Sequence, residues 1–539
     1  MGHLKSFAAI AALLPVLGIA STHASPHGDA ESCAALAGKS FGPGRIESAD
    51  WKPNGDTVKT SASSATVSVP FCRVIGVATP TRDSHIGFEV WLPPASSWNG
   101  DFRGEGSGGS AGNISPGPMS DALANGYATM STDNGHVDPP GTNYGLAWAY
   151  QHPQKMIDWG WRALHLSTLA AKDVVKAFYG KPAGKNYFVA CSAGGHHALM
   201  EATRFPADYD GMVAGAAPWK WTTLMIGHTW NAIPALKDAS ALTADSAAIL
   251  NRRMVAACDK LDGVEDGLIA DPRRCTVDPG DFQCKPGETA NCLTQSQVDA
   301  ARHIYAGATR HDGTRINPGQ VRGSEFGWAP IMAGARPGGS SWEFWRQAVF
   351  QDPSFQNVNF DFDRDTDRAM KTKIGDETLA QVYDQKPDLR AFAKRGGRMI
   401  LFHGLGDFQI SPLVDIDFYN HIAALQGQQQ TDAFLRFFLI PGMGHCSGGP
   451  GFSHIGGATG KPIKDDPDHD MVKALDRWVK HEDAPSLFIA ARLNDKKDVV
   501  ATRPICRYPL EAKYSGQGDV NLAANWTCRA QEKLPPQPM

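Results

Sequence analysis

Short apolar runs alternate with amphipathic stretches between about residues 65 and 220, and this alternation predicts an α/β fold. Residues 86–93 (IGFEVWLP) and the start of 186–195 (NYFVACSAGG) have the length of buried strands. Residues 161–180 (WRALHLSTLAAKDVVKAFYG) have the length and spacing of a helix. Strands that alternate with helices in this way predict a parallel sheet flanked by helices.

The pattern changes between about residues 222 and 390, which hold four cysteines, Asp-Gly turns and many aromatic side chains. The strand and helix alternation then returns at 398–407 (RMILFHGLGD), 434–445 (FLRFFLIPGMGH) and 469–481 (HDMVKALDRWVKH). We therefore predict one α/β catalytic domain made of residues 25–221 and 391–539, with residues 222–390 inserted into it.

The N-terminus carries the pattern of an export signal. Lys5 precedes the apolar run Phe7–Ala20, and Thr22-His23-Ala24 offers a small-residue cleavage site. The run is short for a membrane span, so residues 1–24 are predicted to be a cleaved signal peptide, with an uncleaved anchor as the alternative. We expect a secreted or periplasmic protein without a membrane anchor after cleavage.

Composition narrows the expected partners. The 539 residues carry a net charge of −4, so no basic surface for nucleic acid is expected. The ten cysteines include no C-x-x-C pair, and an even count in an exported chain favours disulfides over a thiolate metal site. Spacing suggests four local pairs and leaves two distant cysteines, although spacing alone does not fix the connectivity. The local pairs are Cys33–Cys72, Cys258–Cys275, Cys284–Cys292 and Cys506–Cys528, and the remaining two are Cys191 and Cys446.

Cys191 and Ser192 stand side by side where a strand is predicted to become a helix, and either is a candidate nucleophile. A nucleophile on such a strained turn needs small residues two positions away on both sides. Ser192 has Ala190 and Gly194 there, whereas Cys191 has the β-branched Val189. Ser192 is therefore the predicted nucleophile, and an ordinary buried serine is the alternative.

A serine nucleophile needs a histidine base and a carboxylate that orients the base. Asp407 follows the predicted strand in 398–407, and His445 follows the next strand. Each residue taken alone has a non-catalytic alternative: Asp407 could simply form a turn, and His445 could be an ordinary loop residue. The order serine, aspartate, histidine, with each residue directly after a strand, is that of α/β-hydrolases and predicts a triad.

Two main-chain N–H groups are expected to bind the oxyanion that forms during ester cleavage. Ala193, directly after the nucleophile, is the first candidate. The second is Gly108 in the glycine-rich loop 102–112 (FRGEGSGGSAG), for which a flexible link is the alternative. The loop lacks the Lys-Ser/Thr of a phosphate-binding loop.

The segments CSAGG, GLGD, PGMGHCSGGPG, GSGGSAG and CDKLDGVEDGLI together resemble the tannase and feruloyl esterase family, which also contains bacterial mono(hydroxyethyl) terephthalate hydrolases. The resemblance covers nearly the whole mature chain. It implies an α/β-hydrolase core with a disulfide-rich lid inserted between nucleophile and acid. It also implies five disulfides, one of which joins the cysteines beside the catalytic serine and histidine, and no organic cofactor.

Acidic residues cluster in the segment 258–275 (CDKLDGVEDGLIADPRRC). Such oxygen-rich loops suit calcium, but the spacing is not that of an EF-hand, and a solvated acidic turn is the alternative. The resemblance implies a structural calcium ion in the lid. Its ligands would be the carboxylates of Asp259, Asp262 and Asp266 with the carbonyls of Val264 and Leu268.

The resemblance implies a serine carboxylesterase for hydroxycinnamoyl, galloyl or related small aromatic esters. Family lids cover the pocket with aromatic and polar side chains, and Ile410 stands where some relatives carry a substrate-stacking phenylalanine. The candidate contacts in the lid are Trp328, Trp342, Phe344, Trp345 and Arg346.

Four alternatives to this function remain open at this stage. The first is another kind of esterase, either a terephthalate-monoester hydrolase or a broad-specificity short-chain esterase. The second is a peptidase of the same fold, and the third is a cysteine hydrolase that uses Cys191 as its nucleophile. The fourth, from a different class, is a catalytically inactive secreted binding protein.

Overall fold

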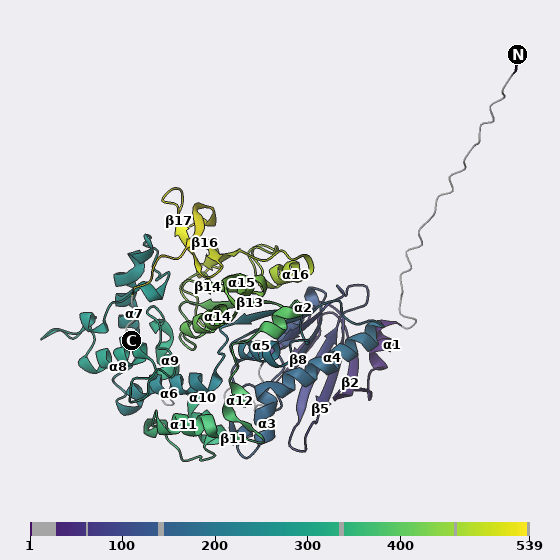
Figure 1. Ribbon diagram of the computed structural model, residues 1–539, viewed down its shortest axis with the longest axis horizontal. Helices are drawn as coiled ribbons and strands as arrows, with labels where there is room; N and C mark the ends of the chain where they lie inside the picture. Colours follow the sequence, from purple (N-terminus) through teal and green to yellow (C-terminus); the bar gives the residue numbers. More distant parts are fainter. Residues whose placement is uncertain (3–27, 61–62, 138–144, 334–338, 458–460, 536–539) are drawn as a thin grey trace.

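The computed structural model describes residues 1–2, 28–60, 63–137, 145–333, 339–457 and 461–535 (Figure 1). The predicted signal peptide therefore lies outside the described residues, apart from its first two. Within the described ranges, no helix is both long enough and apolar enough to cross a membrane.

The described strands form one large mixed sheet and four small two-stranded sheets. In spatial order, the large sheet contains β1 (Ser40–Phe41), β2 (Gly44–Lys52), β5 (Phe71–Ala78), β6 (Ile86–Leu92), β8 (Ala128–Thr132), β7 (Phe102–Glu105), β9 (Asn186–Cys191), β10 (Gly211–Gly215), β13 (Arg398–Gly404) and β14 (Leu435–Ile440). The small sheets pair β3 (Thr57–Lys59) with β4 (Ser64–Thr66), β11 (Lys373–Ile374) with β12 (Glu377–Thr378), β15 (Leu487–Leu493) with β16 (Val499–Cys506), and β17 (Leu510–Tyr514) with β18 (Trp526–Ala530).

The predicted parallel sheet is only half of the observed one. The strands from β8 to β14 are parallel, but those from β1 to β8 pair antiparallel. The connection between β5 and β6 is only residues 79–85, which is too short for the crossover that parallel neighbours need. The antiparallel pairing of β5 with β6 therefore follows from connection length, which the strand pattern alone did not weigh.

Both faces of the parallel half are buried. In β9, Phe188 and Ala190 belong to one hydrophobic core, while Tyr187 and Val189 belong to another. This alternation is that of a strand covered on both sides. The helices around the sheet are α1 (Asp29–Ala34), α2 (Pro116–Ala124), α3 (Pro153–Ile157), α4 (Ala163–Tyr179), α5 (Ala193–Arg204), α13 (Arg390–Lys394), α14 (Leu413–Gln426), α15 (Gln428–Phe434) and α16 (Met471–His481).

Helix α16 shows how the sequence specifies one of these layers. The Asp470 side chain accepts hydrogen bonds from the main-chain N–H groups of Val472 and Lys473 and so caps the helix. Leu475 and Trp478 are buried in the second core, and each such side chain contributes about 2 kcal/mol by leaving water. α4, α5 and α14 fill the first core on the opposite face.

Between β10 and β13 the chain adds a helical segment without a strand of the large sheet, gathered on one side of the molecule (Figure 1). Part of it has its own core, around Met254 and Trp328, while Leu224 and Phe344 join the first core of the sheet. The division into two domains at residues 222 and 390 stays a prediction. The helices of this segment are α6 (Trp221–Lys237), α7 (Ala244–Cys258), α8 (Gln295–Ala306), α9 (Trp328–Met332), α10 (Gly339–Glu343), α11 (Arg364–Lys371) and α12 (Leu379–Tyr383).

Candidate active site

Ser192 occupies the sharp turn between β9 and α5. Its backbone has φ 62° and ψ −125°, a conformation that is strained for a residue with a side chain. The surroundings are crowded, since a Cβ added at Gly194 would lie 2.6 Å from the Cβ of Ala190. The small residues on both sides of Ser192 therefore meet the steric demand on which the sequence argument rested.

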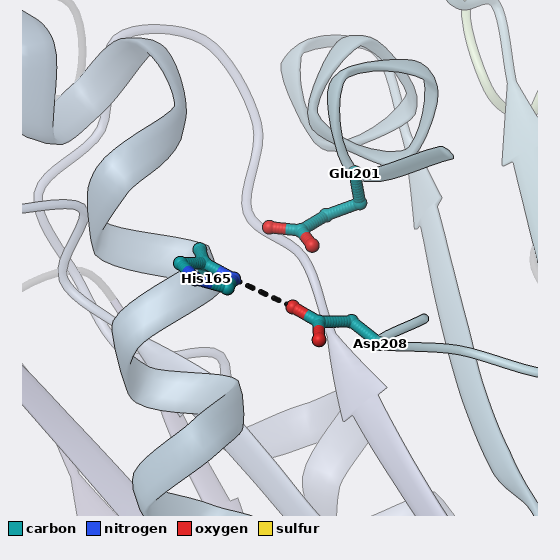
Figure 2. A group of neighbouring side chains, drawn as sticks. All are labelled: His165, Glu201 and Asp208. Atoms are coloured by element: carbon teal, nitrogen blue, oxygen red, sulfur yellow. Dashed lines mark hydrogen bonds and ion pairs between the residues drawn. The ribbon is translucent and has the colours of Figure 1, made fainter. Parts of the chain in front are cut away.

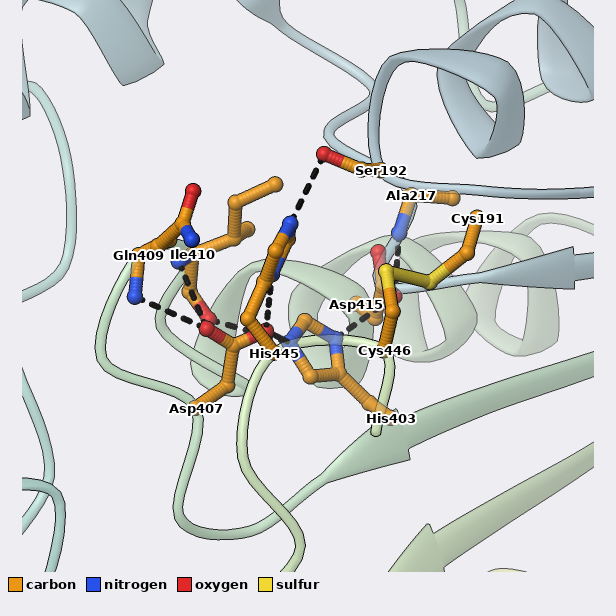
Figure 3. The surroundings of a disulfide bond; sticks show 10 residues. All are labelled: Cys191, Ser192, Ala217, His403, Asp407, Gln409, Ile410, Asp415, His445 and Cys446. Carbon is orange, nitrogen blue, oxygen red and sulfur yellow. Dashed lines mark hydrogen bonds and ion pairs between the residues drawn. A yellow bond between two sulfur atoms is a disulfide. The ribbon is translucent and has the colours of Figure 1, made fainter. Parts of the chain in front are cut away.

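His445 lies between Ser192 and Asp407. Its Nε2 is 2.8 Å from the Ser192 Oγ, and its Nδ1 is 2.8 Å from the Asp407 Oδ2 (Figure 3). Asp407 and His445 follow β13 and β14, whose carboxyl ends reach the same edge of the sheet as that of β9. When Nδ1 donates to the carboxylate, Nε2 is left to accept the serine proton. The three predicted residues thus form one hydrogen-bonded chain.

Asp407 is fully buried and well supplied with donors. Its Oδ1 accepts hydrogen bonds from the main-chain N–H groups of Gln409, at 2.8 Å, and Ile410, at 3.0 Å. Burial alone would raise the pKa of Asp407, but the charges and hydrogen bonds of His445 and His403 outweigh burial and hold this pKa below its ordinary value. The carboxylate is therefore ionised at neutral pH.

A disulfide lies against the triad. Cys191 pairs with Cys446, so the bridge joins the residue before Ser192 to the residue after His445 (Figure 3). All ten cysteines are paired as the spacing suggested, and no free thiol remains for Cys191 to act as a nucleophile. The bridge closes a sequence separation of 255 residues, for which the chain-entropy model gives about 5 kcal/mol of stabilisation.

The two predicted oxyanion donors lie in elements that meet at the turn of Ser192. Ala193 opens α5, and the N–H groups of a first helical turn have no partner within the helix. The glycine loop packs against this turn, since a Cβ added at Gly106 would lie 2.5 Å from the Cβ of Ala190. Gly108 belongs to that loop, but the loop residues that line the pocket are Gly109 and Ser110.

A mostly apolar pocket opens beside Ser192. Two lining residues have a buried polar atom without a hydrogen bond within the described residues: the Oγ of Ser110 and the Nε1 of Trp159. A second hollow, lined by Asp262, Arg274 and Glu511, contains none of the triad residues. The larger side chains that line the pocket are Trp159, Trp221, Leu224, Met225, His228, Phe344, Tyr383, Gln409 and Ile410.

The predicted substrate contacts divide into two groups. Phe344 and Ile410 line the pocket. The other candidates are placed elsewhere: Trp345 is fully buried with its Nε1 2.7 Å from the Thr229 Oγ1, and Arg346 donates to the carbonyl of Pro353. A tryptophan whose N–H has found a buried acceptor belongs to the core.

Two further tryptophans of the inserted segment also lie away from the pocket wall. Trp328 is fully buried and donates to the Ser324 hydroxyl, and Trp342 packs against the guanidinium of Arg346.

Three aromatic residues of the pocket were missing from the sequence prediction. Trp159 lies in a π-helical turn before α4, Trp221 begins α6, and Tyr383 ends α12. Their positions in the chain are far apart and share no motif. Tyr383 alone lies in the aromatic-rich inserted segment, and that composition does not distinguish core from pocket.

The acidic loop presents the oxygen donors that calcium prefers. The Asp259 carboxylate accepts from the main-chain N–H groups of Asp266 and Gly267, at 3.1 and 2.9 Å, and Asp266 lies 2.7 Å from Arg503. Burial and the charge of Asp266 raise the pKa of Asp262. Three carboxylates that crowd one turn fit a hard divalent cation by their chemistry, although their oxygens are not gathered around one point.

Within the described ranges, one cluster of three metal-ligating side chains has its ligand atoms within 4.8 Å of one another: His165, Glu201 and Asp208 (Figure 2). His165 Nδ1 is 2.7 Å from an Asp208 oxygen, and Lys172 donates to the Asp208 carbonyl. Burial and the charge of Asp208 raise the pKa of Glu201 well above its ordinary value. Burial and the charge of Asp208 thus favour the protonated form of Glu201.

Comparison with known proteins agrees with this geometry. A sequence model described as tannase and feruloyl esterase matches residues 72–529. An esterase of Xanthomonas campestris pv. campestris, described as uncharacterized, is 34% identical over 97% of this chain and 94% of its own. A probable feruloyl esterase B-2 of Aspergillus flavus is 32% identical over 83% of this chain and 85% of its own. The crystal structure of feruloyl esterase B from Aspergillus oryzae aligns with a TM-score of 0.85 at 28% identity, covering 93% of this chain and 100% of that one.

Proposed function

Since the chain belongs to the tannase and feruloyl esterase family and is a carboxylic ester hydrolase, we propose that it cleaves esters of phenolic aromatic acids through a serine acyl-enzyme. The observation that carries the proposal is the hydrogen-bonded chain from Ser192 through His445 to Asp407, which ends at an apolar pocket.

In the proposed acylation step, the Ser192 Oγ attacks the ester carbonyl while His445 Nε2 takes the hydroxyl proton. The tetrahedral oxyanion is held by the main-chain N–H of Ala193 and by that of Gly108 in the glycine loop. Collapse of this intermediate breaks the ester C–O bond, and the leaving alcohol takes the proton from His445. Asp407 keeps the imidazole in the correct tautomer throughout.

In the proposed deacylation step, a water molecule takes the place of the alcohol. His445 removes a proton from this water, which attacks the acyl carbon, and Ser192 leaves with the proton returned by His445. The products are the free aromatic acid and the resting enzyme.

The pocket supports an aromatic acyl group. Trp159, Trp221 and Phe344 offer flat apolar surfaces against which an aromatic ring can pack. None of the described lining residues is a lysine or an arginine that would bind the free carboxylate of a terephthalate monoester. The names of the relatives, which include feruloyl esterases, support the same substrate class.

The test is Ser192→Ala beside the control Ser120→Ala on α2, which lies outside the pocket. We expect Ser192→Ala to lose turnover of methyl ferulate and methyl gallate and to lose labelling by a serine-directed fluorophosphonate, while the control keeps both. Full aryl-ester turnover by Ser192→Ala contradicts the mechanism. An unlabelled wild-type protein indicates a binding protein, and a preference for a terephthalate monoester contradicts the proposed substrate class.

We also propose a structural calcium ion in the lid, held by Asp259, Asp262 and Asp266 with the carbonyls of Val264 and Leu268. The oxygen-rich donor set supports it. Metal analysis of the purified protein is expected to find calcium, and chelation is expected to lower the melting temperature. Asp262→Asn is expected to abolish that response to chelator.

Export to the periplasm or the cell exterior completes the proposal. Five disulfides are typical of an oxidising compartment, and the N-terminal pattern supports a signal peptide. Mass spectrometry of the exported protein is expected to find an N-terminus after Ala24.

A further inference from the structure

A second histidine, His403, contacts the same carboxylate oxygen of Asp407 as His445 does (Figure 3). It is the penultimate residue of β13 and is fully buried. Its Nε2 lies 3.2 Å from the Asp407 Oδ2 and 2.9 Å from the carbonyl oxygen of Ile410. Its Nδ1 lies 2.7 Å from an oxygen of Asp415.

Both ring nitrogens of His403 therefore face only acceptors. A neutral imidazole has a single N–H, so one of its nitrogens would turn a lone pair toward an oxygen. With both carboxylates ionised, only the imidazolium satisfies every contact. Burial by itself lowers the pKa of His403, but Asp415 and Asp407 outweigh burial and raise this pKa to about 10.

Asp415 anchors the far end of this arrangement. It lies on α14, and its Oδ2 also accepts from the main-chain N–H of Ala217, just beyond β10, at 2.9 Å. His403 thus connects the acid loop to a carboxylate that is itself held by a neighbouring strand and helix. His403 therefore donates to Asp407 from a side chain whose pKa is raised above its ordinary value.

We propose that His403 is a positioning residue for Asp407, acting as a buried imidazolium that fixes the carboxylate and offsets part of its negative charge. This inference rests on the proposed triad. A carboxylate with less net charge stabilises a protonated His445 less, which keeps His445 available as a base at lower pH. His403 does not line the pocket, so its effect on substrate binding is small.

Three variants separate the effect of the positive charge of His403 from the effect of its packing in the core. His403→Gln keeps a donor but removes the cation, His403→Lys keeps a cation, and Asp415→Asn removes the second anion. The readout is the acidic limb of the kcat/KM profile, which reports the loss of a proton from His445. The titratable groups near Asp407 are His403, Asp415, His445 and His228, and burial lowers the pKa of His228.

His403→Gln is expected to lower kcat about 10- to 100-fold with little change in KM. It is also expected to move the acidic limb to higher pH by about one unit. Asp415→Asn is expected to move the limb the same way, to higher pH, because loss of the Asp415 charge lowers the pKa of His403 and with it the positive charge beside Asp407. His403→Lys is expected to restore the limb toward wild type.

A merely structural role lowers the melting temperature of all three variants and leaves the acidic limb at the wild-type pH, and that result overturns the proposal. If His403→Gln does not fold, Asp415→Asn decides the question alone: an unshifted limb in that variant overturns the proposal. Ser192→Ala is measured in the same series. An active Ser192→Ala overturns the proposed function, whereas an inactive Ser192→Ala with a wild-type profile for His403→Gln overturns this inference only.

Discussion

The two sides of the candidate active site are built in different ways. On one side, Ser192, Asp407 and His445 stand on loops that directly follow three parallel strands, and a disulfide joins two of these loops. On the other side, Phe344 and Tyr383 come from the helical insertion and share no common pattern. On the catalytic side, the ends of neighbouring strands determine where the three residues lie. On the pocket side, the positions of the residues depend on how individual side chains pack. We therefore expect substitutions on the catalytic side to lower kcat/KM for every ester. Substitutions on the pocket side are expected to change which esters the protein prefers.

The largest effect is expected from Asp407→Asn. The amide cannot hold His445 in the tautomer that accepts the serine proton, so kcat falls about 10,000-fold on every ester while KM changes little. Steady-state kinetics on several aryl esters measures both quantities. A loss confined to one substrate breaks the comparison, because it places Asp407 in substrate recognition.

The next effect concerns the bridge between the loops. Replacing Cys191 and Cys446 together by serine is expected to lower kcat about 10-fold and the melting temperature by several degrees, since both loop position and chain entropy are affected. The control replaces Cys506 and Cys528, whose separation is only 22 residues and which join β16 to β18. The control is expected to lose stability but to keep kcat. Equal kcat in both pairs argues against a positional role for the first bridge.

On the pocket side, Trp159→Ala removes one aromatic wall of the pocket. Loss of this apolar surface is expected to lower kcat/KM for a ferulate ester about 10-fold relative to an acetate ester, whose acyl group has no ring to bury. Trp161→Ala is the matched control, because Trp161 lies outside the pocket with its Nε1 3.3 Å from Glu377. An equal loss on both esters contradicts a contact between Trp159 and the aromatic acyl group.

The smallest effect is expected for a residue that influences the stability of the fold but not the catalytic reaction. Glu201 lies on α5, the helix that follows Ser192, and its raised pKa means that the folded protein holds a proton that the unfolded chain releases above about pH 4. Wild-type stability therefore falls as pH rises above this value, and Glu201→Gln removes that dependence. The variant is expected to melt about 1 to 2 °C higher at pH 7 and equally at pH 4, with unchanged kcat. Thermal melts across pH measure it, and a lower melting temperature at pH 7 contradicts the interpretation.

The sequence predicted the catalytic side because local rules fix it. Ser192 could be predicted from its small neighbours alone. Asp407 and His445 could be predicted from their positions directly after strands. His403 escaped prediction because an apolar strand context, LFHG, marks a core residue, and its charge depends on Asp415, twelve positions later. Trp159 escaped because nothing local distinguishes a pocket tryptophan from the buried Trp345. The antiparallel pairing of β5 with β6 was not predicted, because the alternation of strands and helices was interpreted without the length of the connection between these two strands.

The bond between Cys191 and Cys446 also sets a time at which the protein can begin to act. A newly made chain in a reducing compartment holds two thiols there instead of a bridge. Under the proposed export, alignment of Ser192 with His445 would be completed only when an oxidant outside the cytosol closes the bond. Maturation of the site would then coincide with departure from the compartment in which the chain was made, and the esters of that compartment would be spared.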